Sequence, residues 1–402
     1  MTAPSEGREA PPVLRLMAGR HKRVKSGHPW VYSNEVVMSA EDKKLAPGTI
    51  VRLEAGSGEP LGLAMFNPRT LIAARVLDRN PAAVIDRAFL TAKVRAAAEL
   101  RERLYPGGYY RLIHAEADGL PGLIVDRYGD LCVVQANTAG MDRLLPELIA
   151  ALEAVVAPAT IVLRNDAAAR QLEGLGEDVR VIKGSIDGLT EVYEYGAPYY
   201  ADLREGQKTG WFYDQRDNRA LVARRAKGAR VLDGYAYIGG FGISCARAGA
   251  REVTILDRSA LSLDLAQQSA KRNGVDDVCR FTKADVFGEL ERLAAAGERF
   301  DIVIVDPPAF VKSRKDLQAG VRGYRKLARL AAPLVVPGGL LFIASCSHNV
   351  DRVTFDEQVA RGLEDADRAA RILFEGGAGL DHPVHPALPE TAYLKASLLQ
   401  LD

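Results

Sequence analysis

The most regular pattern of apolar and polar positions lies at residues 229–259, ARVLDGYAYIGGFGISCARAGAREVTILDRS. Two short apolar runs end at acidic residues, the first at Asp233 and the second at Asp257. Three glycines follow the first run, at Gly239, Gly240 and Gly242. A fourth, Gly249, lies shortly before the second run. The pattern predicts a strand, a glycine-containing turn, a helix and a second strand. Such a βαβ unit places ligands at the carboxyl ends of its strands.

The rest of the chain divides into segments of different periodicity. Residues 13–80 alternate short strand-like runs with Gly, Ser and Pro turns, which predicts a small β domain. Residues 81–104 have apolar positions at helical spacing, and hairpin and helix patterns follow. Beyond residue 198, strand and helix patterns alternate, as in a doubly wound α/β domain. We therefore expect a flexible tail at 1–12, a β domain at 13–80, a linker helix and central α+β domain at 81–198, and an α/β domain at 199–402.

Composition is typical of a globular enzyme. Of the 402 residues 48% are hydrophobic, which can fill the cores of two or three domains. No apolar run approaches the roughly 18–20 residues that cross a bilayer, and the N-terminus lacks an apolar signal region. We therefore expect a cytoplasmic protein without membrane contact. The four cysteines show no CxxC spacing, so neither a metal site nor a disulfide framework is expected. The net charge of +1 does not by itself indicate a nucleic-acid partner.

The turn after the first strand of the βαβ unit lacks the GxGxxG pattern of dinucleotide sites. Asp233 leads this turn, and a carboxylate there would repel a phosphate. It suits a ligand with positive charge, such as the amino group and sulfonium of S-adenosylmethionine (SAM). Asp257 is placed for both ribose hydroxyls, and Asp285, at the end of the next strand, for the adenine amino group. The alternatives are an ordinary α/β core and a nicotinamide-dependent oxidoreductase, which the missing motif disfavours.

A loop at residues 206–224, GQKTGWFYDQRDNRALVAR, leads into the βαβ unit. Asp214 and Asp217 lie near the start of a predicted helix, where acids interact favourably with the helix dipole. The aromatic run Trp-Phe-Tyr at 211–213 would be exposed unless the loop covered a ligand. We therefore expect this loop to close over the ligand opposite Asp233.

The segment FDIVIVDPPAF at residues 300–310 predicts a buried strand that ends in two prolines. The prolines hold the backbone extended and fix Asp306. The Asp306 carboxylate and the carbonyls of Pro307 and Pro308 could bind the exocyclic amino group of a flipped base, with Phe310 stacked on it.

Two basic segments are candidate contacts for an RNA backbone. The first follows the double proline and is the densest positive charge in the chain, with Lys312, Arg314, Arg322 and Arg325 as candidates. The second lies in the β domain, with Arg20, Lys22 and Arg23 near the aromatic residues Trp30, Tyr32 and Phe66. The alternative for both is a solvated surface, with the aromatic residues in the core of a small barrel.

Together these motifs resemble the PUA-domain ribosomal RNA methyltransferases that make 5-methylcytosine in large-subunit rRNA, the RlmI-like group. The resemblance spans nearly the whole chain, in the order GHPWVYSNEV, EADGLPGLIVDRYGD, QKTGWFYDQRDNR, VLD…GGFG, DPPAF and SCSHNV. It implies an N-terminal PUA-like β-barrel, a central α+β domain and a C-terminal Rossmann-like class I methyltransferase domain. The positions that match the family's SAM pocket are Phe212, Asp214, Arg216, Asp233, Tyr235, Gly239, Asp257, Asp285 and Asp306, and Cys346 matches its nucleophile.

The resemblance implies that 5-methylcytosine forms through a covalent adduct. A thiolate at Cys346 would add to carbon 6 of cytosine and make carbon 5 nucleophilic, while Asp306 would bond the ring nitrogen or the amino group. Many RNA cytosine-5 methyltransferases carry a second cysteine after the prolines, where this chain has Ala309. The first turn also departs from the family's bulkier or hydroxyl residues, which would weaken SAM binding, at Gly234, Ala236 and Ile238.

Two other functions fit the same motifs. DPPAF also resembles the [DN]PP[FY] motif of enzymes that methylate exocyclic amines without a covalent intermediate, which would leave Cys346 as a buried thiol. The other is an RNA-binding protein of ribosome assembly with a vestigial methyltransferase fold. The family implies ribosomal RNA of the large subunit as the partner. The sequence neither requires nor excludes a homodimer.

Overall fold

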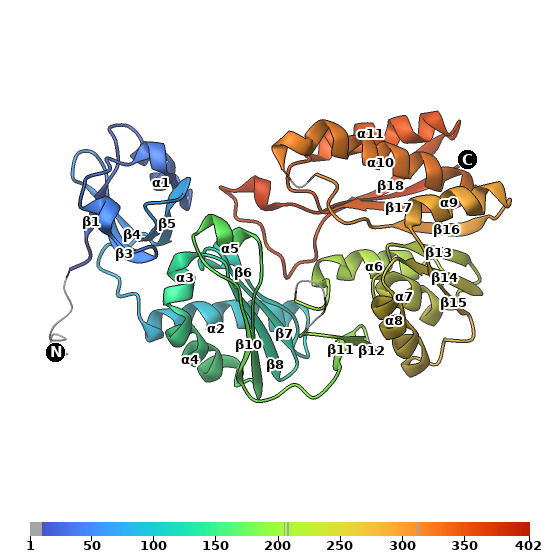
Figure 1. Cartoon of the computed structure of the whole chain (residues 1–402), viewed down its shortest axis with the longest axis horizontal. Coiled ribbons are helices and arrows are strands. Elements are labelled where there is room, and N and C mark those ends of the chain that lie inside the picture. Colours follow the sequence, from blue (N-terminus) through green and yellow to red (C-terminus); the bar gives the residue numbers. More distant parts are fainter. Residues whose placement is uncertain (1–9, 205, 207–208, 312) are drawn as a thin grey trace. The chain divides into compact units, whose positions relative to one another are not determined.

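The computed structural model describes residues 10–204, 206, 209–311 and 313–402, which form two compact units (Figure 1). The N-terminal unit comprises the residues up to Asp187 together with Pro383–Pro389. The C-terminal unit comprises Gly188–His382 and Glu390–Asp402. Most of the predicted flexible tail, residues 1–9, lies outside the described residues, and the other predicted domain boundaries stay predictions.

The first sheet of the N-terminal unit has five short strands in the order β1-β3-β4-β5-β2. Their bounds are β1 (Val13–Arg15), β2 (Trp30–Tyr32), β3 (Thr49–Glu54), β4 (Pro60–Phe66) and β5 (Ile72–Asp78), and helix α1 (His21–Lys25) precedes β2. Leu14, Val51 and Phe66 are fully buried in its core. The small β domain predicted from the alternation is confirmed, and Phe66 is a core residue.

The second sheet of this unit has the order β10-β9-β8-β7-β6, in which only β8 and β9 run parallel. Its strands are β6 (Tyr109–His114), β7 (Leu123–Tyr128), β8 (Leu131–Ala136), β9 (Thr160–Asn165) and β10 (Asp178–Lys183). The helices are α2 (Arg87–Leu104), α3 (Ala139–Arg143), α4 (Leu145–Val156) and α5 (Ala169–Leu172). Helix α2 starts later than predicted, because the Asp86 carboxylate caps it by accepting the Phe89 N–H at 3.0 Å.

The C-terminal unit is built on a seven-stranded sheet of order β15-β14-β13-β16-β17-β19-β18, in which only β19 runs antiparallel to its neighbours. The strands are β13 (Arg230–Gly234), β14 (Glu252–Asp257), β15 (Cys279–Lys283), β16 (Phe300–Val305), β17 (Val335–Ser345), β18 (Ala370–Gly376) and β19 (Lys395–Leu401). A separate hairpin, β11 (Thr190–Glu194) and β12 (Ala197–Ala201), precedes the sheet.

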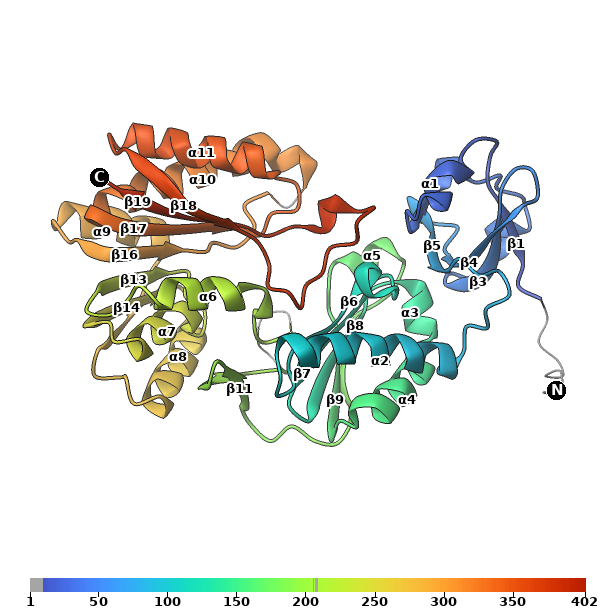
Figure 2. The same ribbon diagram turned by 180° about the vertical axis from the view of Figure 1, so that it is seen from behind.

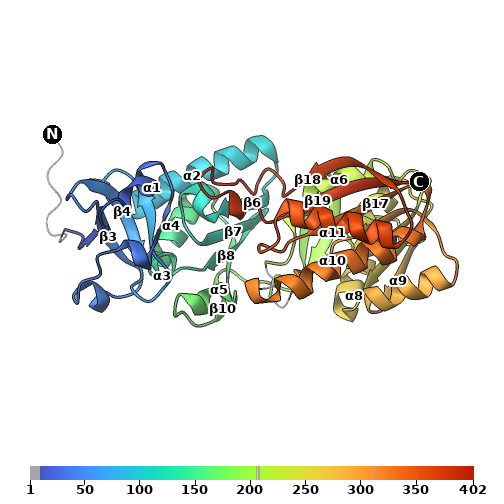
Figure 3. The ribbon, with the colours of Figure 1, turned by 90° about the horizontal axis from the view of Figure 1, so that it is seen from above.

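Helices cover both faces of this sheet (Figures 1 and 2). One face carries α6 (Arg216–Ala223), α7 (Gly240–Arg247) and α8 (Ala260–Arg272), and the other carries α9 (Val286–Ala295), α10 (Leu317–Ala331) and α11 (Arg352–Asp365). Helices α10 and α11 lie side by side (Figure 3). The parallel strands are buried on both faces, which explains their nearly continuous apolar runs. The predicted doubly wound domain is confirmed. Among the described helices, none is long and apolar enough to span a bilayer.

The hairpin β11–β12 packs against helix α8. The Tyr200 N–H donates to Ser269 Oγ at 2.9 Å, and Arg272 Nε donates to Glu191 Oε1 at 2.9 Å. These contacts attach the hairpin to the C-terminal unit, although its sequence pattern had placed most of it in the central domain.

Candidate active site

The strand order of the large sheet reverses between the neighbours β13 and β16. In an open α/β sheet, ligands bind at the carboxyl ends of the strands beside such a reversal. Asp233 belongs to the end of β13, and Asp306 and Cys346 directly follow β16 and β17. The structure therefore brings the predicted acidic residues and the predicted nucleophile to the same edge of one sheet.

Asp233 holds the turn that follows β13. Its side chain is only 1% exposed, and its Oδ2 accepts the Gly242 N–H at 2.7 Å. A Cβ at Gly242 would lie 3.1 Å from that same oxygen, so the glycine permits the close approach. Burial raises the pKa of Asp233 to about 7, against the opposing effect of the Gly242 hydrogen bond. The observed role of Asp233 is to fix the turn, and its contact with SAM stays a prediction.

Asp257, at the end of β14, orders the same turn. Its Oδ2 accepts the Tyr237 N–H at 2.9 Å and its Oδ1 accepts the Ser259 N–H at 2.8 Å. Each carboxylate oxygen has a further acceptor position, which suits ribose hydroxyls. Tyr235 and Tyr237 adopt the left-handed conformation, with φ of 61° and 52°, so the turn is conformationally constrained. Asp285 is exposed and caps α9 through the Gly288 N–H at 3.1 Å.

A buried ion pair fixes the loop that precedes α6. Arg219 donates from Nε to Glu194 Oε1 at 2.6 Å and from Nη2 to Glu194 Oε2 at 2.5 Å. The Trp211 Nε1–H donates to the same carboxylate at 3.1 Å, and the Arg219 guanidinium lies 4.4 Å from the Trp211 ring centroid. The prediction that the aromatic run would be exposed without a ligand is wrong, since Trp211 and Tyr213 are 3% and 1% exposed. Glu194 and Tyr199 contact Trp211, and Arg216 packs on Tyr213.

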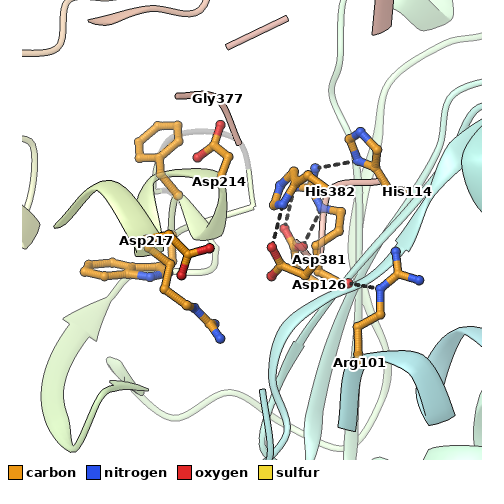
Figure 4. A network of polar contacts seen from close by, with 12 residues as sticks. Arg101, His114, Asp126, Asp214, Asp217, Gly377, Asp381 and His382 are labelled. Carbon is orange, nitrogen blue, oxygen red and sulfur yellow. Dashed lines mark hydrogen bonds and ion pairs between the residues drawn. The ribbon is translucent and has the colours of Figure 1, made fainter. Parts of the chain in front are cut away.

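The predicted cofactor residues of this loop lie next to a returning segment at Gly377–Gly379. Asp214 is buried, its Oδ2 accepts the Tyr393 O–H at 2.5 Å, and its carbonyl accepts the Gly379 N–H at 2.9 Å. Figure 4 shows Asp214 close to Gly377. Arg216 is also buried, with its guanidinium 5.0 Å from the Tyr213 ring centroid. Phe212 is half-buried and meets the Tyr237 ring edge-on at 5.3 Å.

A hydrogen-bonded chain connects α6 to the double proline. Asn218 Nδ2 donates to Gln215 Oε1 at 2.6 Å, and Gln215 Nε2 donates to Asp306 Oδ2 at 2.8 Å. Gln215 is 3% exposed, so its amide is held in one orientation. Sequence reasoning did not select Gln215 or Asn218, although both lie in the QKTGWFYDQRDNR motif. Asp306 itself is half-buried, Pro307 is buried and Pro308 is exposed.

Cys346 differs from the other cysteines of the chain. Cys132, Cys245 and Cys279 are buried, whereas Cys346 is only partly buried. Its Sγ–H donates a long hydrogen bond of 3.9 Å to the Pro307 carbonyl oxygen. The alternative of a fully buried core thiol therefore does not describe Cys346. The thiol and the Asp-Pro-Pro turn are adjacent although they lie far apart in the sequence.

Buried hydroxyl groups hold the backbone on both sides of Cys346. Ser345 Oγ donates to the Tyr324 hydroxyl at 2.8 Å, and the Tyr324 and Ser347 hydroxyls lie 2.7 Å apart. Ser347 Oγ also accepts the Val311 N–H at 3.2 Å. Burial raises the pKa of Tyr324, which keeps its hydroxyl neutral. This network attaches the thiol-bearing segment to α10 and to the segment after Phe310.

Phe310 belongs to an aromatic cluster instead of standing free. Its ring stacks on Phe287 with centroids 5.9 Å apart and tilts against Tyr324 at 4.8 Å. A Cβ at Gly323 would lie 2.8 Å from Phe310 Cδ2, which explains a glycine within α10. The cluster fixes Phe310, and its stacking on a base stays a prediction.

The residues predicted to contact RNA differ in solvent exposure and in their ion pairs. Lys312 lies outside the described residues, as does the side chain of Arg314. Arg322 is exposed, whereas Arg325 forms two hydrogen bonds of 2.6 Å to Asp365. In the N-terminal unit Arg20 and Lys22 are exposed, while Arg23 lies 3.4 Å from Glu35 and 4.8 Å from the Tyr32 ring centroid.

The sequence profile of the S-adenosylmethionine-dependent methyltransferase family matches residues 178–399, and that of PUA-like domains matches residues 14–79. Ribosomal RNA large subunit methyltransferase I of Cronobacter sakazakii is 36% identical over 391 residues, covering 95% of this chain and 97% of the relative. The chain belongs to that methyltransferase family. The protein of the same name from Aeromonas salmonicida is 36% identical over 392 residues, with 96% and 98% coverage. The predicted family and PUA-like domain are confirmed.

Two solved structures share the fold across the chain. One is described as a SAM-dependent methyltransferase from Streptococcus mutans, with a TM-score of 0.81, 20% identity, and coverage of 97% of this chain and 100% of the other. Another methyltransferase structure, described as a complex with SAH, has a TM-score of 0.83 at the same identity and coverage. The Rossmann-like fold is thus confirmed.

SAM is the cofactor of this family, and the turn after β13 fits it. Gly239 has φ of 78°, a conformation that favours glycine, and opens α7 toward the carboxyl ends of the strands. Asp257 offers the free acceptor positions that ribose hydroxyls require. Within the part of the chain that the structure describes, no group of three or more His, Cys, Asp or Glu could hold a metal ion.

Proposed function

We propose that this protein methylates carbon 5 of a cytosine in large-subunit ribosomal RNA through a covalent adduct at Cys346. The observation that carries the proposal is the juxtaposition of the Cys346 thiol and the Asp306-Pro307 turn. Sγ lies 3.9 Å from the Pro307 carbonyl, at the edge of the sheet where ligands bind. A nucleophile and a base-recognition turn are both needed for this chemistry, and they occupy one site.

The reaction begins when the Cys346 thiolate adds to carbon 6 of the cytosine ring. The electron pair of the 5,6 double bond then makes carbon 5 nucleophilic, and carbon 5 forms a bond to the methyl group. SAM, when bound, would supply that methyl group, and the sulfonium sulfur would leave as the neutral thioether. Removal of the carbon-5 proton by a base restores the double bond and expels the thiolate. Many RNA cytosine-5 methyltransferases have a second cysteine at the position of Ala309. The alanine side chain cannot accept a proton, so Ala309 is not that base.

Asp306 orients the cytosine. Its Oδ2 accepts from Gln215, and a carboxylate oxygen is a suitable acceptor for an exocyclic amino group. Asn218 holds the buried Gln215 amide in one orientation, and Gln215 in turn orients the Asp306 carboxylate. We infer that this orientation exists before the cytosine binds. Such positioning contributes to the rate because the reacting atoms need not be ordered during the reaction.

The nature of the partner rests on the relatives and on the first domain. The relatives at 36% identity are named for large-subunit ribosomal RNA, and residues 14–79 match a PUA-like domain. We infer that the N-terminal domain and the exposed Arg322 contact RNA phosphates. An enzyme with this substrate would act in the cytoplasm.

Methylation of an exocyclic amine is the second candidate function. The motif Asp306-Pro307-Pro308-Ala309-Phe310 and the absence of a second cysteine at Ala309 favour it. On this alternative Asp306 accepts a hydrogen bond from the amine that is methylated, and Cys346 takes no part. An RNA-binding protein without catalysis is the third candidate.

A trapping experiment tests the covalent proposal. RNA that contains 5-fluorocytosine cannot lose the carbon-5 substituent as a proton, so an adduct formed at Cys346 persists. We expect an RNA–protein complex that survives a denaturing gel with the wild type and SAM, and with the control variant Cys279→Ala. No complex should form with Cys346→Ala. An adduct that persists in Cys346→Ala, or its absence from the wild type with an otherwise active enzyme, would contradict the proposal.

We also infer that the protein is a homodimer formed through the edge strand β18. Ile372, Leu373 and Phe374 are 51%, 48% and 37% exposed, and an edge strand of this kind invites pairing. Strand β18 carries Arg371 and Glu375 on either side of a β-bulge at Leu373, so an antiparallel second copy would bring opposite charges together across this edge. Light scattering should give twice the chain mass for the wild type and a single chain mass for Leu373→Arg. A wild-type monomer at micromolar concentration would contradict the inference.

A further inference from the structure

A buried lysine lies beside the segment that carries Cys346. Lys395 is the first residue of β19 and pairs with Ser345 in the antiparallel register of β17. Only 5% of Lys395 is exposed. Lysine is rarely buried to this extent without a partner, because removing an ammonium group from water is costly. This lysine belongs to none of the motifs that the sequence analysis selected.

Among the residues that the structure describes, no carboxylate forms an ion pair with Lys395. Its Nζ donates to the Ser347 carbonyl at 2.6 Å and to the Tyr393 carbonyl at 2.7 Å. An ammonium has three donors, so one remains after these two bonds. Because Ser347 follows Cys346 and Ser345 precedes it, the ammonium lies against the short segment that bears the thiol.

The titratable and charged groups near Lys395 and Cys346 come from the start of α11, from α10 and from the turn after β16. Burial lowers the pKa of Lys395 to about 8, and the interaction with Cys346 is the largest effect in the opposite direction. At the start of α11, Arg352 lowers this pKa further and Asp351 raises it. Tyr324 on α10 interacts with Cys346 as a neutral hydroxyl, and Asp306 after β16 precedes the Pro307 that Sγ approaches. The Lys395 ammonium therefore interacts electrostatically with Cys346 and is hydrogen-bonded to the residue that follows it.

We propose that the ammonium of Lys395 stabilises the thiolate of Cys346 and so makes this cysteine nucleophilic near neutral pH. Lys395 is a positioning residue, since it acts through the thiol and not on the substrate. The proposal rests on the proposed role of Cys346, and it accounts for a cation that is kept at the edge of the sheet despite its burial. A thiolate is stabilised by an adjacent cation in the same way at other reactive cysteines.

The test measures the thiol directly in the full-length protein without RNA or SAM. The rate of Cys346 alkylation by iodoacetamide is followed by peptide mass spectrometry between about pH 5 and pH 10. In Lys395→Met, which keeps the length of the apolar stem but removes the charge, we expect the alkylation midpoint to move to higher pH. A movement of about one pH unit would lower the rate at neutral pH about tenfold. Lys395→Arg should retain most of the wild-type rate, and Lys271→Met, at an exposed lysine of α8, should leave the profile unchanged.

A second measurement does not require that Lys395→Met folds. If ammonium and thiolate stabilise each other, replacing the thiol must change the titration of the lysine. With 13C-labelled lysine, the NMR titration of Lys395 should move to lower pH in Cys346→Ser than in the wild type. An unchanged alkylation midpoint in a folded Lys395→Met, or an unchanged Lys395 titration in Cys346→Ser, would overturn the proposal. Neither readout requires methyl transfer, so failure of the proposed reaction would be seen separately, in the RNA product.

Discussion

The side-chain amide of Gln215 donates a hydrogen bond of 2.8 Å to the carboxylate of Asp306. The two residues are 91 positions apart, and this bond connects the loop before α6 to the turn after β16. The loop therefore influences the orientation of the residue that we expect to bind the cytosine. A substitution at Gln215 can change catalysis without contact with the RNA.

We predict that Gln215→Ala lowers kcat about tenfold, because a lost hydrogen bond to a carboxylate costs about 1.5 kcal/mol or more. Gln215→Glu should lower it further, since a second carboxylate would repel Asp306. The rate of labelled methyl transfer to RNA is the measurement. Gln268→Ala is the matched control, because its amide bonds Asp264 at the same 2.8 Å on the exposed surface of α8. Equal rates for Gln215→Ala and Gln268→Ala would refute the orienting role.

The buried Asp233 predicts a pH dependence of stability. Its pKa rises from 3.8 to about 7 on folding. A carboxyl group with a raised pKa binds its proton more tightly in the folded state. Its contribution is therefore full below the unfolded value and is lost as the pH rises through about 7, by about 4 kcal/mol in all.

Asp233→Asn should remove this loss while its side-chain oxygen still accepts the Gly242 N–H. Relative to the wild type, the variant should gain free energy of unfolding between about pH 4 and about pH 7, the window between the unfolded and folded pKa values. Urea denaturation of the C-terminal unit at the two pH values measures this, with Asp264→Asn as the exposed control. If the free energy of unfolding changed equally with pH in Asp233→Asn and the wild type, the raised pKa of Asp233 would be contradicted.

The ion pair of Glu194 and Arg219 should be far more sensitive to single than to double substitution. Arg219→Leu removes both guanidinium hydrogen bonds of the buried Glu194 carboxylate and leaves it the longer ion pair with Arg216, at 3.7 Å, so the variant should destabilise the C-terminal unit by about 3 kcal/mol. The double variant Glu194→Leu/Arg219→Leu should recover part of that loss. Denaturation followed by tryptophan fluorescence reports on the pair, because Trp211 packs on Arg219. If the double variant lost as much free energy of unfolding as the two single variants together, or more, Glu194 and Arg219 would not be coupled as described.

Arg322 and Arg325 should differ in their effects on RNA binding. Arg322 is exposed, whereas Arg325 is held by Asp365. Arg322→Ala should weaken binding by about 1 kcal/mol and reduce the slope of log affinity against log salt by about one. Arg325→Ala should change both quantities less. Filter binding over a series of salt concentrations decides this, and equal salt slopes for Arg322→Ala and the wild type would exclude a phosphate contact at Arg322.

Much of the fold could be predicted because its signals are local. The glycines and acidic residues between Arg230 and Asp257 define strand, turn, helix and strand within one short segment, and β13, α7 and β14 appear there. The Asp-Pro-Pro turn and Cys346 were also selected from local motifs and from the resemblance. Their proximity required the strand order of the sheet, which periodicity alone does not specify.

The residues that sequence reasoning missed act over long separations in the chain. Glu194 is 25 positions from Arg219, and its carboxylate accepts the Trp211 N–H, so the polar group of this buried indole is bonded without a ligand. Gln215 reaches Asp306 across 91 positions. Lys395 resembles an ordinary surface lysine in the sequence, and only the pairing of β17 with β19 places it beside Cys346.

The central claim is that Cys346 forms a covalent bond to cytosine during methyl transfer. Its most direct test is nucleoside mass spectrometry of ribosomal RNA that lacks the modification, after incubation with SAM and either wild-type protein or Cys346→Ala. We predict new 5-methylcytosine with the wild type and none with the variant. A methylated purine, or any methylated nucleoside that still forms with Cys346→Ala, would contradict the claim and favour methylation of an exocyclic amine.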